Sequence, residues 1–409
     1  MFYHLKQFFT LIPKILPPAI GSIMLITFAM HPEATTTGAS RGMYTWWHII
    51  VPSLLPFFIM SEFLVRFGVV HFGGTILEPI MRPLFNVPGV GAFPLIMGST
   101  SGAPVNGSII ASLRYHGLLT KSEGNRLLIF TSNSSLLFMI SAIPVGMLNQ
   151  PELGVLIAGT HLGANLMLGV AAGFASKLGD STAANKRYPQ VLNTSNILSD
   201  AFKAMKTYLG GDNGIRSKCY DIVYTSMVQI FFIGGYIIFF SVTIELTTST
   251  QFIDMVEDLI HLILPNQFLS ENTVKPLLIG LLETTIGTEQ TVSNKENLLD
   301  ALTLVAFLLG WGGLSVHAQI STVIAESDLS LRYFFIARLI HGLLAGVLIR
   351  FLILSNLFVV PSFAMPATQE GILTEFNPFL QYVPFLLIIT LLLIISMMVF
   401  SLIIWMIKK

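Results

Sequence analysis

Two short stretches of this sequence set polar side chains among glycines inside otherwise apolar segments. The polar residues of the first stretch, 98–107, include Ser101 and Asn106. Those of the second stretch, 280–288, are Glu283, Thr284, Thr285 and Thr288. A glycine-rich break at membrane depth leaves backbone N–H groups free at the start of a half-helix, where they attract an anion. Hydroxyl and amide side chains add hydrogen bonds without the desolvation cost of a full charge. This pattern indicates reversible binding of a small polar or anionic solute.

Each stretch is followed along the chain by a second apolar segment that small and polar residues interrupt. In the first half this segment, 130–135, holds Ser132, Asn133 and Ser134. In the second half the segment 310–319 holds Ser315, His317 and Gln319. Interrupted apolar segments at corresponding positions of two inverted halves are typical of the midplane binding site of a transporter. The sequence therefore predicts a substrate site to which both halves contribute.

For two ionisable residues in these segments, the sequence is compatible with more than one role. Glu283 inside an apolar segment serves as a proton, cation or substrate ligand, or else as a structural carboxylate that caps a half-helix. His317 binds substrate or carries a proton, or else makes an interhelical hydrogen bond. The small polar residues form a binding cluster, or they hold membrane helices together.

The glycine pairs at 159 and 163, at 169 and 173, and at 342 and 346 have the spacing of close helix packing, and the adjacent His161 and His341 are expected to pack with one hydrogen bond each. Arg338 and Arg350, about three turns apart on one helix, are expected to snorkel or to form an ion pair, with a binding role as the alternative.

Other classes of function lack their sequence patterns. There is no His-Glu-x-x-His motif and no P-loop, so hydrolytic metalloenzymes and ATP-driven pumps are disfavoured. The single cysteine, Cys219, excludes a multi-cysteine metal site, and the 22 basic and 22 acidic residues cancel, which leaves no bulk charge to bind nucleic acid. We expect neither an enzyme nor a resident cofactor or metal. The coupling ion, proton or sodium, and a homo-oligomeric assembly remain open.

The composition requires a lipid bilayer around most of the chain. Of its 409 residues 53% are hydrophobic and 11% are charged, against about 25% charged in soluble domains. Apolar stretches near the ~20 residues that a bilayer core demands predict eight spanning helices, at 9–30, 45–65, 127–148, 153–176, 222–246, 299–324, 333–360 and 380–407. The fold class expected is an all-α polytopic membrane protein with inverted repeats.

Loop charges orient these spans. The segment 177–221 is rich in lysine and arginine, so the positive-inside rule puts it in the cytoplasm. Counting spans in both directions then puts 114–126 and 325–332 in the cytoplasm as well, and 247–274 on the opposite side. Segments 92–113 and 275–290 must each enter and leave on one side, the first from the cytoplasm and the second from the other face. If both crossed fully, the basic segment would move outside.

Three regions follow from this topology. Residues 1–176 form a first membrane repeat with the re-entrant segment 92–113, and residues 222–409 form a second repeat with the re-entrant segment 275–290. Between them, 177–221 is a basic cytoplasmic loop in which Lys203 and Lys206 lie on an amphipathic helix at the membrane surface.

Four motifs carry a resemblance to a known family. They are Ser101-Gly102-Ala103-Pro104, the stretch 127–138, Leu282-Glu283-Thr284-Thr285-Ile286-Gly287 and the stretch 312–319. Together they resemble the YlbJ-type sporulation integral membrane proteins, of the nucleoside-recognition or gate-domain superfamily related to concentrative nucleoside transporters. The resemblance implies a role in endospore formation, with export of dipicolinic acid from the mother cell across the outer forespore membrane. The alternatives are a carrier of a nucleoside or related heterocycle and a non-transporting scaffold of the spore envelope.

Overall fold

The computed structural model describes residues 18–136, 138–178, 199, 201–203, 205–206, 215–263, 271–293, 297–355 and 357. Every regular element within these residues is a helix and none is a strand, which confirms the all-α class. The expected span 380–407 and most of the loop 177–221 lie outside the described residues. Lys203 and Lys206, expected on an amphipathic helix, lie in short helical stretches of this loop and are exposed.

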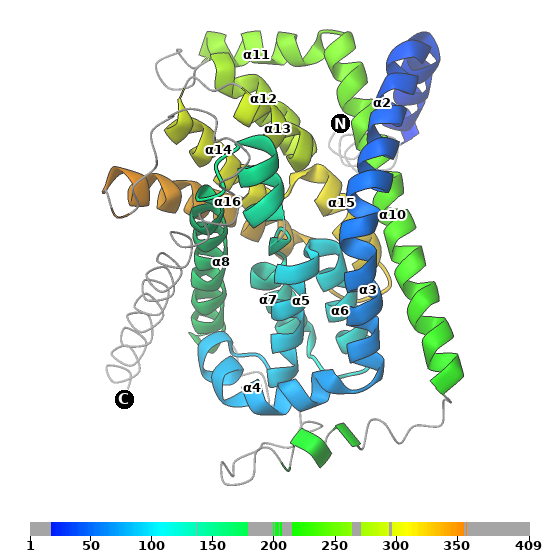
Figure 1. Ribbon diagram of the computed structural model, residues 1–409, viewed down its shortest axis with the longest axis vertical. Coiled ribbons are helices and arrows are strands. Elements are labelled where there is room, and N and C mark those ends of the chain that lie inside the picture. Colours follow the sequence, from blue (N-terminus) through cyan, green and yellow to red (C-terminus); the bar gives the residue numbers. More distant parts are fainter. Residues whose placement is uncertain are drawn as a thin grey trace, which may run out of the picture.

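The helices fall on either side of the central loop. Those of the first half are a helix over Pro18–Met30, α2 (Pro32–Tyr44), α3 (Val51–Arg66), α4 (Val69–Phe85), α5 (Ala92–Ser101), α6 (Ala103–Tyr115), α7 (Lys121–Thr131) and α8 (Leu153–Leu178), with π-helical turns over Thr45–Ile50 and Phe138–Met147. Those of the second half are α10 (Ile215–Ser249), α11 (Phe252–Ile263), α12 (Glu271–Leu282), α13 (Thr284–Ser293), α14 (Leu298–Trp311), α15 (Gly313–Ile324) and α16 (Leu331–Leu354). In Figure 1, α4 and α11 lie across opposite ends of the molecule.

Four described segments are long and apolar enough to cross a membrane. They are Leu153–Ser176, Lys218–Ser249, Leu298–Ile324 and Leu331–Leu354, which match four of the eight expected spans. A bent pair, Phe72–Phe85 with Gly89–Ser99, turns by 88° and is either a broken span or a re-entrant loop. The sequence did not single out its first part. The described residues therefore support four or five spans, and the number eight and the inverted sense of the repeats stay predictions.

Helices in both halves break where the sequence places glycine or polar residues. In the first half α5 and α6 meet at Gly102, whose φ of +91° suits glycine, and α7 gives way to non-helical backbone over 132–135. In the second half α12 and α13 meet at Glu283, and α14 and α15 meet at Gly312, with φ of +85°. The same order of elements, a broken pair and then a broken helix, thus occurs in each half.

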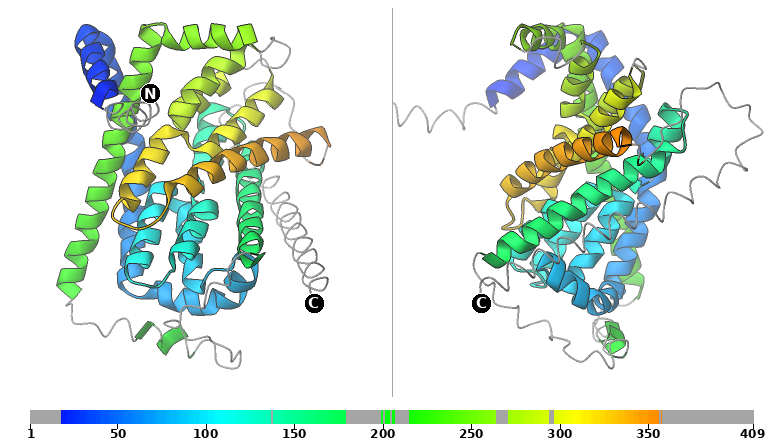
Figure 2. Two further views of the ribbon diagram at one scale, coloured as in Figure 1. Left: turned by 180° about the vertical axis from the view of Figure 1, so that it is seen from behind. Right: turned by 90° about the vertical axis from the view of Figure 1, so that its left-hand side faces the viewer.

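Small residues bring the long helices together. A Cβ at Gly42 of α2 would lie 2.8 Å from the Ile238 Cα of α10, and a Cβ at Gly310 of α14 would lie 2.5 Å from the Gly342 Cα of α16. Such contacts leave no room for a larger side chain, so the backbones approach closely. The close-packing role predicted for Gly342 is confirmed. In the left view of Figure 2 α16 runs across α8, and the contacts of α8 with α16 and of α2 with α10 are among those that join the two halves.

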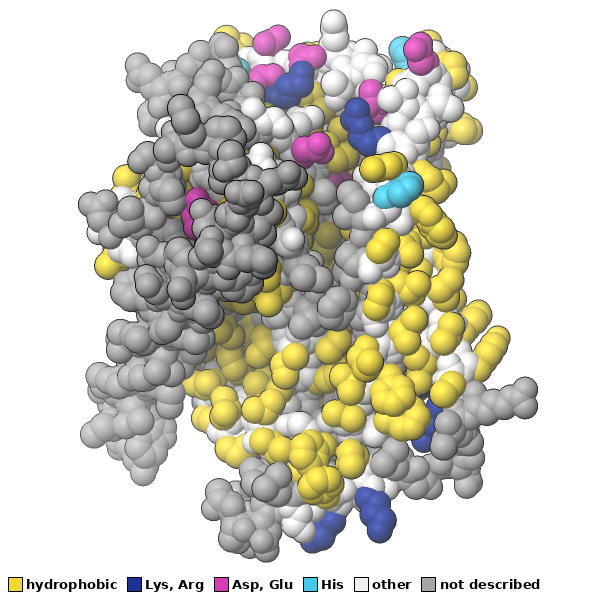
Figure 3. Space-filling model, in the orientation of Figure 1, with side chains coloured by type: hydrophobic (Ala, Val, Ile, Leu, Met, Phe, Trp, Pro, Cys, Tyr) yellow, Lys and Arg dark blue, Asp and Glu magenta, His cyan; other side chains and the backbone are white. Residues whose placement is uncertain are grey.

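The surface separates an apolar middle from charged ends. Figure 3 shows hydrophobic side chains over a broad region of one face, with acidic and basic groups near the end that carries α11 and basic groups near the other. Many of the exposed hydrophobic side chains belong to α10 and α16, among them Phe231, Phe232, Leu343 and Val347. An apolar face of this kind needs a lipid or protein cover.

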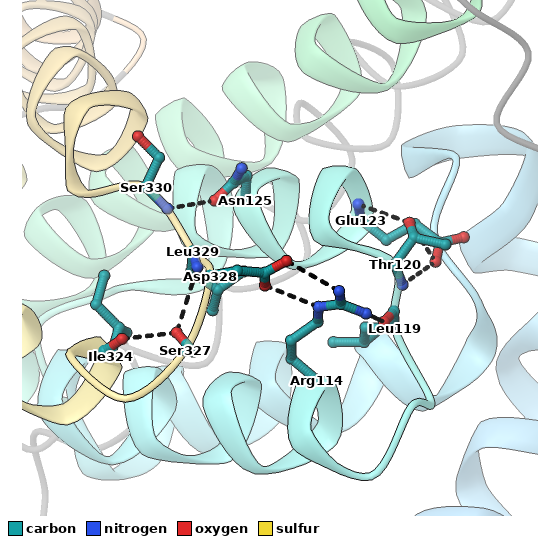
Figure 4. A network of polar contacts seen from close by, with 10 residues as sticks. All are labelled: Arg114, Leu119, Thr120, Glu123, Asn125, Ile324, Ser327, Asp328, Leu329 and Ser330. Carbon is teal, nitrogen blue, oxygen red and sulfur yellow. Dashed lines mark hydrogen bonds and ion pairs between the residues drawn. The ribbon is translucent and has the colours of Figure 1, made fainter.

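Ion pairs at the helix ends agree with the predicted topology. Arg114 at the end of α6 forms two 2.9 Å bonds to the carboxylate of Asp328, before α16, and donates to Leu119 O (Figure 4). Both loops are predicted to be cytoplasmic. Arg350 and Asp300, 2.7 Å apart, both lie at ends predicted to face the opposite side. The other ion pairs between separate helices likewise join groups that the topology puts on one side: Arg41 with Glu245, Arg66 with Asp221, Arg82 with Glu123 and Lys275 with Asp254.

Candidate functional site

The two breaks of the second half pack against each other. A Cβ at Gly313 would lie 3.0 Å from both the backbone nitrogen and Oγ1 of Thr284, and 3.1 Å from Leu282 O. Only a glycine at 313, with φ of +74°, permits this approach. Trp311 Nε1 donates to Leu281 O at 3.1 Å across the same contact. The non-helical residues of both broken helices therefore lie together in the protein interior.

Glu283 occupies the break between α12 and α13 and is 9% exposed. Its Oε2 accepts a 2.8 Å hydrogen bond from the backbone N–H of Ile286, in the first turn of α13. This is the geometry of an N-terminal cap, one of the two roles considered for Glu283. The cap leaves the charge without a basic partner among the described residues, so an ion or substrate role remains compatible with it.

The predicted threonines surround this cap. Thr284 Oγ1 donates to Leu308 O at 3.4 Å, which ties α13 to α14. Thr288 is fully buried and its Oγ1 has no hydrogen-bond partner. Thr285 is half-buried beside them. A buried hydroxyl without a partner is unusual in a folded protein, and it makes Thr288 available to a ligand or water.

On α15, His317 is 2% exposed and lies against Trp311, with ring centroids 4.3 Å apart, and against Phe335 at 4.2 Å. Its Nδ1 contacts Gly313 O at 2.7 Å, and its Nε2 is buried without a partner. Because a carbonyl oxygen only accepts, Nδ1 carries the proton in this contact, and Nε2 of a neutral ring is then a free acceptor. Further along the helix, Gln319 donates to Ser315 Oγ at 3.1 Å.

The first-half residues gather around the end of α7. Asn106 is buried on α6 and its amide nitrogen lies 2.6 Å from Thr131 Oγ1 and 3.3 Å from Ser132 Oγ, while its Oδ1 has no partner. Gly98 permits this arrangement, since a Cβ there would collide with Thr131 O. Ser101 ends α5, and its side chain lies outside the described residues.

The non-helical backbone after α7 is held by neighbouring helices. Asn133 Nδ2 donates to Ser99 Oγ of α5 at 3.0 Å, and its Oδ1 accepts from Asn165 of α8 at 2.5 Å. The Ser134 N–H donates to His161 Nε2 at 3.3 Å, and Ser134 Oγ donates to Leu309 O of α14 at 3.3 Å. This last bond joins the two groups of predicted site residues, one around α7 and one around the α14 and α15 break.

Sequence reasoning missed the residues that hold the α7 break. Asn165 was not singled out, His161 and His341 were read as packing residues, and Arg338 was read as snorkelling or ion-paired. That reading of Arg338 is wrong. The side chain is buried and donates to the carbonyls of Ile129 and Ser132. The three-residue spacing of Arg338 and His341 indicates that both lie on one face of their helix. It does not show that this face meets α7, which only the tertiary packing determines. Arg350, on the same helix, is ion-paired as expected.

A small cavity lies between α6, α10 and α15. Its volume is about 30 Å³, and its lining includes Pro104 of the first motif, Gln319 of the second, and Gln229 and Tyr236 of α10. Gln229 donates to Ser108 Oγ of α6 at 2.8 Å, and Tyr236 OH bonds to Thr322 Oγ1 of α15. A volume of this size is too small for an aromatic solute. Among the described residues no group of three His, Cys, Asp or Glu side chains is placed to hold a metal ion.

These features define an α-helical integral membrane protein whose broken helices pack together at their breaks. The chain is 36% identical over 329 residues to the sporulation integral membrane protein YlbJ of Bacillus subtilis (strain 168), which covers 80% of this chain and 79% of the relative. The chain belongs to this family of sporulation integral membrane proteins, as its motifs suggested. Residues 47–151 match the Gate family, described as nucleoside recognition. No solved structure matches the chain.

Proposed function

We propose that this protein is a secondary transporter that exports dipicolinic acid from the mother cell across the outer forespore membrane during endospore formation. The observation that carries the proposal is the contact between the Gly312-Gly313 break and the Glu283-Thr284 break. Irregular backbone buried at membrane depth is tolerated where it lines a binding site or a water-filled path. Membership of a sporulation membrane protein family supports the cellular context.

The donors near the two breaks suit a small dicarboxylate. Two half-helices, α13 and α15, begin at these breaks and offer backbone N–H groups. Unpartnered groups at Thr288, His317 and Asn106 add hydrogen-bonding capacity that a polar ligand can use. The cavity between α6, α10 and α15 is too small for an aromatic solute, so a cargo bound there would require these helices to separate. No step of this proposal is catalytic.

The driving ion is a proton or sodium, and Glu283 is the group we assign to it. It is the one carboxylate among the predicted site residues, and it has no basic partner in the described part of the chain. A carboxylate without a counter-charge can bind a cation or a proton in step with an anionic cargo.

A second cargo follows from a different observation. The match of residues 47–151 to a family described as nucleoside recognition favours a nucleoside or related heterocycle. The amides and hydroxyls of the predicted site residues, among them Asn106, Asn133 and Thr288, are suited to the edges of a heterocycle.

Flux measurements distinguish these cargoes. Proteoliposomes that contain the purified protein are loaded with dipicolinate or uridine. Efflux of the solute is then followed with and without a pH or sodium gradient. We expect dipicolinate flux above that of protein-free vesicles. Flux of uridine alone would support the nucleoside carrier. If neither solute moves, while sporulating cells lacking the protein retain dipicolinate in the mother cell, a scaffold role would replace transport.

A further inference from the structure

Arg338 of α16 is among the largest fully buried side chains in the protein, with 2% of its surface exposed. Four of its five N–H groups have acceptors. Nη1 donates to Ser132 O and to His341 Nδ1 at 2.9 Å, and Nη2 donates to Ile129 O and to Asn165 Oδ1 at 3.0 Å. The fifth group, Nε–H, is buried and has no partner. The guanidinium is therefore held rigidly with one donor unused.

All of these acceptors are neutral. Two are backbone carbonyls and one is an amide. The fourth, His341 Nδ1, must be an unprotonated acceptor because arginine only donates, and its Nε2 then donates to His161 O at 2.8 Å. His161 in turn accepts from the Ser134 N–H, so one of its ring nitrogens is unprotonated as well. Among the described residues no carboxylate lies within ion-pair distance of Arg338.

The position of this charge is specific. Ile129 and Ser132 lie at the C-terminal end of α7, where the chain leaves the helix and enters the non-helical residues 132–135. The negative end of the α7 dipole offsets part of the charge, since a helix C-terminus attracts a cation. A helix end carries only about half a unit charge, so a net positive charge remains beside Ser132, Asn133 and Ser134.

We propose that Arg338 is the counter-charge for an anionic substrate bound at the α7 break, and that it selects a carboxylate over a neutral heterocycle. This inference rests on the proposed transport function and specifies the chemical class of its cargo. An unpaired charge in the interior of a membrane protein is costly and is kept where it meets a functional partner. The unused Nε–H is the first contact for a carboxylate oxygen, and the carbonyls of Ile129 and Ser132 hold the guanidinium when no substrate is present.

Two ligands of equal shape test this on the unaltered protein. Pyridine-2,6-dicarboxylate and its neutral diamide differ in charge and little in size, and binding of each to purified protein in nanodiscs is measured by calorimetry. We expect the dianion to bind at least about 30-fold more tightly, because leaving one member of a buried charge pair unmatched has a cost of that order. Equal binding of dianion and diamide would overturn the inference whatever the variants show.

Variants then assign the effect to this residue. R338Q should weaken dianion binding by about 30-fold or more and leave diamide binding unchanged, whereas R338K, which keeps the charge, should bind the dianion within a few-fold of the unaltered protein. R350Q, which removes an exposed arginine of the same helix, is the matched control and should change neither. Undiminished dianion binding by folded R338Q would overturn the inference and leave the transport proposal intact. If R338Q fails to fold, the inference is still tested by the comparison of dianion and diamide binding to the unaltered protein and by dianion binding to R338K.

Other results would contradict the assignment of dipicolinate as the cargo without contradicting the role of Arg338. If the unaltered protein binds isophthalate, a benzene dicarboxylate, through Arg338 but does not bind dipicolinate, then anion selection holds and dipicolinate is the wrong cargo. If it binds uridine and no dicarboxylate, both proposals fail.

Discussion

Gly313 on one broken helix and Thr284 on another lie so close that a Cβ on the glycine would stand 3.0 Å from the threonine backbone nitrogen. The two residues are 29 positions apart in the sequence, and each begins a half-helix, α15 and α13. Two helix starts therefore share one interior location. The close contact depends on a residue without a side chain and with a positive φ, which makes Gly313 a sensitive position for testing the site.

Replacing Gly313 by alanine should destabilise the protein by more than about 1–2 kcal/mol, the cost of a side chain in the left-handed region, because the new Cβ also meets Thr284. Thermal unfolding in detergent measures this loss. Gly235 of α10 is the control, since a Cβ there meets nothing within 4 Å, and G235A should be neutral or stabilising by up to about 1 kcal/mol. A G313A protein as stable as G235A would show that the two breaks separate readily.

Glu283 should reveal its role through two substitutions. Gln keeps an oxygen that can accept from the Ile286 N–H, so E283Q should unfold within about 0.5 kcal/mol of the unaltered protein, whereas E283A should lose about 1 kcal/mol with the cap. If Glu283 also carries the coupling ion, E283Q abolishes dipicolinate flux or its pH dependence despite normal folding. Normal flux with an unchanged pH profile in E283Q would leave Glu283 as a helix cap alone.

Local sequence signals predicted the breaks well. Gly102, Gly312 and Gly313 adopt positive φ, and Glu283 interrupts an apolar segment, so each break could be placed from residue type alone. The helix Phe72–Phe85 was not expected as a membrane segment, since two prolines and two charged residues obscure its apolar face. Arg82 pairs with Glu78 one turn earlier in the same helix and with Glu123 of α7, and a pattern in one segment cannot show the second contact.

The residues around the α7 break could not be predicted from the sequence either, because they come together through contacts between distant segments. Arg338 lies more than 200 positions from the carbonyls that it binds, and its helix looked like an ordinary span with an arginine near each end. Spacing along α16 identifies which residues share a face, but it does not say which helix that face meets. The absence of arginine or lysine from the polar motifs suggested recognition mostly by hydrogen bonds and helix dipoles, whereas the structure places the guanidinium of Arg338, from a distant helix, beside Ser132.

The Arg114 and Asp328 pair predicts a change of stability in acid. The hydrogen bonds from Arg114 lower the pKa of Asp328 in the folded protein, so the pair contributes its full stability above the unfolded pKa of about 3.9 and loses it as the pH falls through the lower folded value. Both side chains are partly exposed, which limits the effect to at most about 1 kcal/mol. Melting temperatures should be higher for the unaltered protein than for D328N at pH 7, and the two should converge only as the pH falls below the lowered folded pKa of Asp328. A constant difference would contradict this account.

The last prediction concerns which ends of the molecule share a side. Ion pairs require Arg114 and Asp328 to lie together, and Asp300 and Arg350 to lie together, while the positive-inside rule puts the first pair in the cytoplasm and the second outside. Cysteines at 328 and at 300, each in a C219S background, are labelled with an impermeant thiol reagent from either face of oriented membranes. We expect 328 to react only from the cytoplasmic face and 300 only from the other, with a cysteine at 121 as the cytoplasmic control. Labelling of 300 and 328 from the same face would contradict a full crossing by Leu298–Ile324, and with it the opposite entry predicted for 275–290.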